Sequence, residues 1–190
     1  WGSQKGFRNW DKQWLPGYCT LHQAIADFDG DGFLDLFCPS YHGQINRESI
    51  PSYLYWGSAD GFHPLNRTVI ICNSACDAQT GDFNGDGVPD VTGVIGDLGG
   101  PSAFIRQSSG GFVQDSVGLP YSYSGFNNFD VTTGDFNGDG LDDIADGNGH
   151  AFFRLPQGGW LDSSVGLPLQ GYEGVDSGDV NGDGFDDLVF

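Results

Sequence analysis

Short apolar runs alternate along the chain with turns rich in glycine, asparagine, aspartate and serine. The runs are four or five residues long and carry β-branched or aromatic side chains; they read FLDLF, YLYW, TVII, AFIR and AFFR at residues 33–37, 53–56, 68–71, 103–106 and 151–154. Such runs, bounded by turn residues, predict β-strands. With 32 glycines and 9 prolines, no stretch sustains the apolar period of an amphipathic helix. The pattern therefore predicts an all-β protein.

The chain also repeats itself. Acid-rich loops begin at Asp27, Asp82, Asp135 and Asp179, at intervals of 55, 53 and 44 residues. A second marker, WGSQKGF at residues 1–7, returns as WGSADGF at 56–62 and more weakly as RQSSGGF at 106–112 and RLPQGGW at 154–160. A third marker pairs FVQDSVGLP at 112–120 with WLDSSVGLP at 160–168. A period of this size fits one small antiparallel sheet per repeat.

We therefore expect four-stranded antiparallel blades, each with one acid-rich loop. A radial β-propeller fits this period best, and an open array of the same blades is the alternative. We expect one repeat domain over residues 1–190. In it, residues 1–26 form the back part of a blade, 27–81, 82–134 and 135–178 are whole repeats, and 179–190 form the front part of another.

Three arrangements of the two partial blades are possible. They can complete one another within the molecule, which closes a ring of four blades. They can complete one another between molecules, which yields a head-to-tail filament of identical copies. Alternatively, the chain is part of a longer propeller.

Each acid-rich loop reads D-x-[DN]-G-D-G-x-x-D, which places oxygen-bearing side chains at positions 1, 3, 5 and 9. Hard oxygen donors are the ligands that Ca²⁺ prefers, and a backbone carbonyl at position 7 with a bidentate Asp at position 9 brings the number of donors to the six to eight that it needs. Mg²⁺ fits poorly in a shell made so largely of protein. Glycines at positions 4 and 6 allow the positive φ angles that turn alternate side chains inward.

The sequence thus predicts about four Ca²⁺ sites, each with five ligand positions. The predicted ligands are Asp27, Asp29, Asp31, Phe33 and Asp35; Asp82, Asn84, Asp86, Val88 and Asp90; Asp135, Asn137, Asp139, Leu141 and Asp143; and Asp179, Asn181, Asp183, Phe185 and Asp187.

The charge of the chain supports cation binding. The formal net charge is -19, and 24 of the 26 acidic residues are aspartate. The loops hold 13 of these 26 acids, and four Ca²⁺ ions would change the formal charge to -11. With only seven Lys and Arg residues, nucleic acids and anionic membrane surfaces are poor partners.

Other loops share only part of the pattern. Simple Asn-Gly or Asp-Gly hairpin turns explain the glycines but not an acid at position 9 in all four copies. An EF-hand needs a bidentate Glu at position 12, where this chain has Cys38, Gly93, Asp146 and Phe190. Dockerin loops continue into a helix, whereas these loops continue into predicted strands.

The acid-rich loop, its Asp at position 9, the strand that follows and the repeat period together resemble the FG-GAP or VCBS repeat family, which includes the integrin alpha-subunit propeller. The resemblance covers essentially the whole chain, although a clear FG…GAP pair is missing from each copy. It implies calcium between the first strands of each blade, in an extracellular protein devoted to adhesion or ligand recognition.

An extracellular setting agrees with two further features. The four cysteines, Cys19, Cys38, Cys72 and Cys76, are an even number that allows three pairings, and we expect disulfides rather than buried thiols. One N-glycosylation sequon, NRT, begins at Asn66 in a predicted hairpin. The chain has neither an apolar run long enough to cross a membrane nor the features of a signal peptide at its start.

Catalysis is not expected. The histidines stand at non-equivalent places, His22, His42, His63 and His150, without a nucleophile or zinc spacing. The acid pairs Asp142–Asp143 and Asp186–Asp187 share their second members with the calcium loops. Trp10, Trp14, Trp56 and Trp160 are expected in hairpin or core packing, with stacking on sugar rings as the alternative.

Three functions follow from these expectations. The chain is a calcium-stabilised, non-catalytic module that recognises a glycan or a protein; or it is a structural subunit of an extracellular filament or surface layer, with copies of itself as partners; or it is the accessory propeller of a secreted enzyme.

Overall fold

The computed structural model describes residues 4, 7, 12–41, 49–73, 75–95, 100–121, 130–168 and 174–190. These residues form four antiparallel sheets, which we call blades 1 to 4 in chain order. Blade 1 contains β1 (Ala24–Ala26), β2 (Asp35–Cys38), β3 (Ser49–Tyr55) and β4 (Arg67–Asn73). Blade 2 contains β5 (Ala75–Gly81), β6 (Asp90–Ile95), β7 (Pro101–Arg106) and β8 (Phe112–Gln114). Blade 3 contains β9 (Val131–Gly134), β10 (Asp143–Asp146), β11 (His150–Arg154) and β12 (Trp160–Asp162), and blade 4 contains β13 (Asp176–Gly178) and β14 (Asp187–Val189).

Within each blade the strands follow one another in chain order, as in the blades of a propeller. This confirms the predicted all-β class of four-stranded antiparallel blades, with blade 4 present as a two-stranded sheet. The division of the chain into repeats at Asp27, Asp82, Asp135 and Asp179 stays a prediction. Each of these residues follows the first strand of its blade, so the observed sheets begin one strand before the loop.

The five predicted strands are present as parts of β2, β3, β4, β7 and β11. The expected start of the first was wrong, because β2 begins at Asp35 and not at Phe33. Phe33 and Leu34 belong to the preceding loop and are 41% and 62% exposed. The first strand of every blade was not predicted, because these strands are short or carry small and polar residues, as in AIA, VTTG and DSG.

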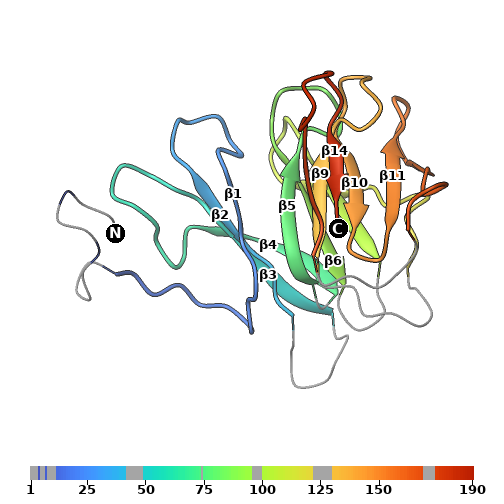
Figure 1. The fold of residues 1–190 in the computed structure, drawn as a ribbon. Coiled ribbons are helices and arrows are strands. Elements are labelled where there is room, and N and C mark those ends of the chain that lie inside the picture. The colour runs from blue at the N-terminus through green and yellow to red at the C-terminus, as the bar shows by residue number, and fades with distance from the viewer. Residues whose placement is uncertain are drawn as a thin grey trace.

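Successive blades pack through their first strands, since β1 contacts β5, β5 contacts β9, and β9 contacts β13. The acid-rich loops follow these strands and lie together at one end of the molecule, the top in Figure 1. Apolar side chains fill the space between blades. Between blades 1 and 2 the buried core includes Phe37 and Phe104, and between blades 2 and 3 it includes Phe83, Ile144 and Trp160.

The face of blade 1 that points away from blade 2 is apolar and partly covered. Leu36 pairs with Tyr55 at the same place in blade 1 as Val91 pairs with Phe104 in blade 2. In blade 2 these two side chains pack against blade 1. Residues 12–18 cover part of this face, and the Tyr55 hydroxyl donates a hydrogen bond to the carbonyl of Pro16.

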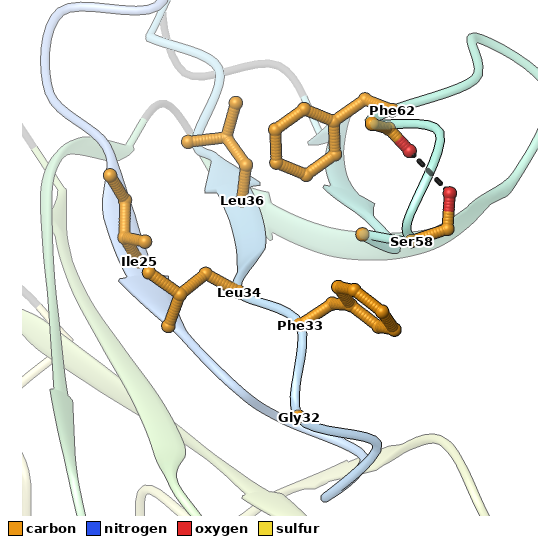
Figure 2. Close-up of a pocket in the computed structure, with 9 residues that line it drawn as sticks. Ile25, Gly32, Phe33, Leu34, Leu36, Ser58 and Phe62 are labelled. Carbon is orange, nitrogen blue, oxygen red and sulfur yellow. Dashed lines mark hydrogen bonds between the residues drawn. The ribbon is translucent and has the colours of Figure 1, made fainter. Parts of the chain in front are cut away.

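A pocket of about 450 Å³ remains beside the covered part. Figure 2 shows the apolar side chains that gather around it, which are Ile25, Phe33, Leu34, Leu36 and Phe62. Blade 1 therefore presents an exposed apolar surface of the kind that packs between blades elsewhere in the molecule.

The expected disulfides are not present among the described residues, which include all four cysteines. Cys38, Cys72 and Cys76 are buried in three different apolar clusters, whereas Cys19 is exposed. Burial raises the pKa of the Cys38 and Cys72 thiols to about 11. In the part of the chain that is described, no helix has the length and apolar character to cross a bilayer.

Candidate metal centres

The first Asp of each acid-rich loop closes the loop by accepting backbone hydrogen bonds. In blade 1, Asp27 Oδ1 accepts from the N–H groups of Gly30 and Asp31 at 2.8 and 3.1 Å, and its Oδ2 accepts from Gly32 at 2.9 Å. Asp82, Asp135 and Asp179 make the same three bonds in their own loops. The four loops therefore share one conformation.

The side chains at loop positions 3 and 5 continue this pattern. Asp29 Oδ1 accepts from the N–H of Asp31 at 3.2 Å, and Asp31 Oδ1 accepts from Phe33 at 2.8 Å. The glycines at positions 4 and 6 have φ values between 72° and 90° in all four loops, which is the left-handed region that glycine adopts without strain. The positive φ angles predicted for these glycines are thus present in all four loops.

In blades 1 to 3 the Asp at position 9 is buried, with 1% exposure for Asp35 and 0% for Asp90 and Asp143, whereas Asp187 of blade 4 is partly exposed. Its Oδ2 accepts from the N–H at loop position 2, as from Phe28 to Asp35 at 2.8 Å. Its Oδ1 accepts from an N–H at or just beyond the end of the third strand, where the donors are Gly57 for Asp35, Arg106 for Asp90 and Arg154 for Asp143. This Asp therefore connects the loop to the interior of its blade.

These bonds also correct the alignment of the repeats. Alignment of the second marker in the sequence pairs Trp56 with Arg106 and Arg154. The strand register instead places Gly57 at the position of these two arginines. A Cβ on Gly57 would lie 2.3 Å from the carbonyl oxygen of Leu34, so no larger side chain fits. In blade 1 the place of Arg106 and Arg154 is therefore occupied one residue later in the marker than the sequence alignment indicated.

The loop carboxylates crowd negative charge around the Asp at position 9. Burial, and to a smaller extent the charges of Asp86 and Asp82, raise the pKa of Asp90 to about 6 against the hydrogen bonds from the backbone. Burial raises the pKa of Asp143 to about 7 in the same way. A bound cation would relieve this repulsion and keep the carboxylates ionised.

The donor set suits a calcium ion. Carboxylate oxygens of Asp27, Asp29 and Asp35 lie within 4.8 Å of one another, close enough to share one ion. The other three loops have the same hydrogen bonds, with Asn84, Asn137 and Asn181 in place of Asp29. Because every donor is an oxygen, the loops match the preference of Ca²⁺ for carboxylate, amide and carbonyl oxygens. The complete ligand set stays a prediction.

Position 8 carries a contact that the sequence analysis missed. Asp142 Oδ2 accepts from the N–H of Asp82 at 2.7 Å, and the Asp142 N–H donates to the Asp82 carbonyl at 3.1 Å. Asp186 and Asp135 form the same two-way link one blade later. The predicted metal loop of one blade is thus bonded directly to the loop of the next.

The remaining predicted residues have varied surroundings. Trp160 is buried and packs edge-on against Phe83, whereas Trp14 is 78% exposed, with the Lys12 ammonium 5.1 Å from its ring. Asn66 is exposed in the β3–β4 connection, as predicted, and its glycosylation stays a prediction. Most of the first marker, residues 1–7, lies outside the described residues. Trp10 and His42 also lie outside them.

Comparison with known proteins agrees with this geometry. The family model of the FG-GAP-like repeat matches residues 27–92 and 82–145. The T-cell immunomodulatory protein of mouse is 25% identical over 80 residues, which are 42% of this chain and 13% of the mouse protein. The rat protein of that name is 23% identical over 93 residues, 48% of this chain and 15% of its own length. The chain matches only a small part of these relatives, and through its repeats it belongs to the FG-GAP-like repeat family.

Proposed function

We propose that the chain is a calcium-stabilised, non-catalytic recognition module of an extracellular protein. One observation carries the proposal: four blades in succession present the same hydrogen-bonded Asp loop at the same end of the molecule (Figure 1). Catalytic sites normally combine different residues at one place, whereas here the most ordered chemistry is repeated. The repeated feature therefore serves the architecture, and surfaces around it are left for binding.

Calcium would supply positive charge to balance the carboxylates of these loops. The loops hold 13 carboxylates, and the buried Asp at position 9 ties each loop to its own blade. When bound, Ca²⁺ supplies a divalent charge that joins the loop oxygens at the end of the first strand to those at the start of the second. Because adjacent loops are bonded through Asp142 and Asp186, ion binding in one blade also supports the next.

Removal of calcium tests this part of the proposal. An ion that binds only the folded state stabilises it by about 2.7 kcal/mol for each site at a concentration 100 times its Kd. We expect about four Ca²⁺ per chain by equilibrium dialysis, and a marked fall in melting temperature when EDTA is added. Equal melting temperatures in Ca²⁺ and EDTA would overturn the calcium assignment.

The recognition role rests on the relatives and on the exposed surface. The matched relatives are named for an immunomodulatory action that involves T cells, and an extracellular receptor or glycan on such cells is the partner class we propose. Fluorescently labelled chain should bind T cells in Ca²⁺ more strongly than in EDTA, as measured by flow cytometry. Binding that is equal on T cells and on unrelated cells, or unaffected by enzymatic removal of surface glycans and proteins, would contradict the role.

A second candidate function is a structural subunit that assembles with copies of itself. It is favoured by the exposed apolar face of blade 1, where Leu36, Phe62 and Ile25 line an open pocket (Figure 2). Sedimentation velocity over a range of concentrations should then show growing assemblies, and Leu36→Lys should abolish them. A chain that stays monomeric at high concentration would exclude this candidate and leave the first.

A further inference from the structure

A second group of metal-ligating side chains lies outside the acid-rich loops. His22, Asp77 and Asp130 each stand five residues before the first Asp of a loop. Asp77 lies within the first strand of blade 2, whereas Asp130 immediately precedes the first strand of blade 3 and His22 lies just before β1. Three consecutive blades therefore contribute one side chain each, and in blade 4 this place is taken by Gly174.

The three side chains meet closely. Donor atoms of His22, Asp77 and Asp130 lie within 4.8 Å of one another, and His22 Nδ1 is 2.7 Å from Asp77 Oδ1. The N–H of Val131 donates to Asp77 Oδ2 at 2.9 Å, and the N–H of Val175 donates to Asp130 Oδ2 at 3.1 Å. Each carboxylate is thus held in place by the backbone of the next blade.

The environment of the group is acidic and opens to solvent on one side. The Asp77 side chain is 1% exposed and the His22 side chain is 54% exposed, while Asp130 is half-buried. Burial, together with the hydrogen bond with the Asp130 side chain, raises the pKa of Asp77 to about 7. Two carboxylates this close together share a proton or a cation, because either one compensates the repulsion between their negative charges.

The turn that follows β10 contacts Asp130 and contains buried polar atoms. The N–H of Gly147 donates to the carbonyl of Asp130 at 3.1 Å. In the same turn, Asn148 is 2% exposed, and neither polar atom of its amide has a hydrogen-bond partner among the described residues. Asp146 Oδ2, which is also buried, likewise has no partner in that part of the chain. Buried polar groups of this kind normally bind ordered water, so this end of the blades suits a hydrated ion.

We propose that His22, Asp77 and Asp130 bind one divalent cation that prefers mixed nitrogen and oxygen ligands, with Zn²⁺ as the best match. Ca²⁺ and Mg²⁺ take oxygen donors, whereas an imidazole with two carboxylates is a donor set for Zn²⁺ or a similar transition metal. Three protein ligands leave the fourth tetrahedral place to water. Gly174 leaves space for this water beside Asp130, because it has no side chain and even a Cβ there would lie 3.5 Å from Asp130 Oδ2.

The proposed ion would join three blades at a place distinct from the calcium loops. Five residues of extended strand separate the two kinds of site, which is about 16 Å. The loops bond neighbouring blades at one end of their first strands, and the ion would bind blades 1, 2 and 3 together nearer the other end. The site therefore has a structural role that does not depend on the calcium proposal.

Zinc titration in saturating Ca²⁺ tests the site, because the loops are then filled. We expect one Zn²⁺ per chain by isothermal titration calorimetry. His22→Ala should weaken the affinity at least tenfold without unfolding the protein, since His22 is exposed. Gly174→His, which offers a fourth ligand beside Asp130, should tighten it. Co²⁺ in place of Zn²⁺ should give the visible absorption bands of a tetrahedral site, and His22→Ala should remove them.

Two control variants separate this site from accidental zinc binding. His63→Ala removes another exposed histidine, and Cys19→Ser removes the exposed thiol near His22; both should retain the wild-type affinity. No zinc binding by the wild type, or equal loss in His22→Ala and His63→Ala, would overturn the proposal. Loss of binding in Cys19→Ser with retention in His22→Ala would also overturn it.

Discussion

Arg154 of blade 3 donates a hydrogen bond from Nε to the backbone carbonyl of Phe83 in the loop of blade 2, at 2.7 Å. Arg106 makes the same bond to Phe28 one blade earlier, at 2.9 Å. Trp160 packs edge-on against Phe83, with ring centroids 5.2 Å apart. The predicted metal loop of each of these blades is therefore held by the third strand of the next, so loop geometry and blade packing depend on one another.

Replacement of Arg154 by Ala should destabilise the protein strongly. Arg154 is 5% exposed and its Nη1 lies 2.9 Å from Asp115 Oδ2. Loss of one partner of a buried ion pair typically costs 3–5 kcal/mol, and partial exposure of Asp115 places the expected loss near the lower value. Urea unfolding in saturating Ca²⁺ measures it.

Arg106→Ala is the matched comparison for this variant. The Arg106 guanidinium makes the equivalent bond to Phe28, but its Nη1 donates to the carbonyl oxygens of Gln107 and Gly111 rather than to a carboxylate. The free energy of unfolding should therefore fall by about 1–2 kcal/mol in Arg106→Ala, which is less than in Arg154→Ala. Equal losses in the two variants would show that the ion pair with Asp115 contributes nothing.

Asp115 should make the stability depend on pH in the acid range. Burial alone would raise the pKa of Asp115, but hydrogen bonds from the Gly159 N–H and the Arg154 guanidinium outweigh it and hold the pKa below 3.8. A lowered pKa in the folded state means that the contribution is complete above pH 3.8 and is lost as the pH falls through the folded value. The difference in stability between wild type and Asp115→Asn should thus be constant from neutral pH to about pH 5 and shrink below about pH 4. A difference that grows on acidification would contradict this.

The loops were predictable from the sequence because their chemistry is local. Each predicted side-chain ligand lies within nine residues of the first Asp, and the glycines define the backbone conformation. The first strands were not predictable, since residues such as Thr132 and Ser177 gain their strand conformation from pairing and from contacts with the next blade, including the bond of 2.8 Å between their hydroxyl groups.

Contacts between blades were likewise not predicted from the sequence. His22 was interpreted as an ordinary histidine because its partners Asp77 and Asp130 lie 55 and 108 residues further along the chain. One signal was available: all three stand five residues before a loop, at equivalent places in the repeat. Alignment of the repeats on the loops, rather than on the less regular second marker, would have brought these residues together.

Gly134→Ala should destabilise the contact between blades 3 and 4. A Cβ on Gly134 would lie 2.5 Å from Asp186 Oδ2, the atom that accepts from the Asp135 N–H. The φ angle of Gly134 is not in the left-handed region, so the cost is steric and amounts to about 1–3 kcal/mol. Thermal unfolding in Ca²⁺ measures it.

Blade 1 provides a natural control for this variant. Ala26 occupies the place of Gly134, and the next blade has Pro89 where blade 4 has Asp186. Because Pro89 has no carboxylate that needs the space, Ala26→Gly should change the stability by less than about 1 kcal/mol through backbone entropy alone. A similar loss in both variants would argue against a steric role for the glycine.

Asp90→Asn should remove one calcium ion and leave the others bound. Asp90 is the Asp at position 9 of blade 2, and its carboxylate accepts from the N–H groups of Phe83 and Arg106. In Ca²⁺ the variant loses a charged ligand, so the measured ions should fall from about four to about three per chain. Asp60→Asn, an exposed acid outside the loops, should leave the number unchanged.

The same variant separates metal binding from a purely structural role of Asp90. Burial, with a smaller contribution from the charges of Asp86 and Asp82, raises the pKa of Asp90 to about 6, so without an ion the charged form opposes folding at neutral pH. Asn carries no charge, and the loss of stability should therefore be clearly larger in Ca²⁺ than in EDTA. If Asp90 acted only through its two backbone hydrogen bonds, Asp90→Asn would cost the same in both solutions and the number of bound ions would not change.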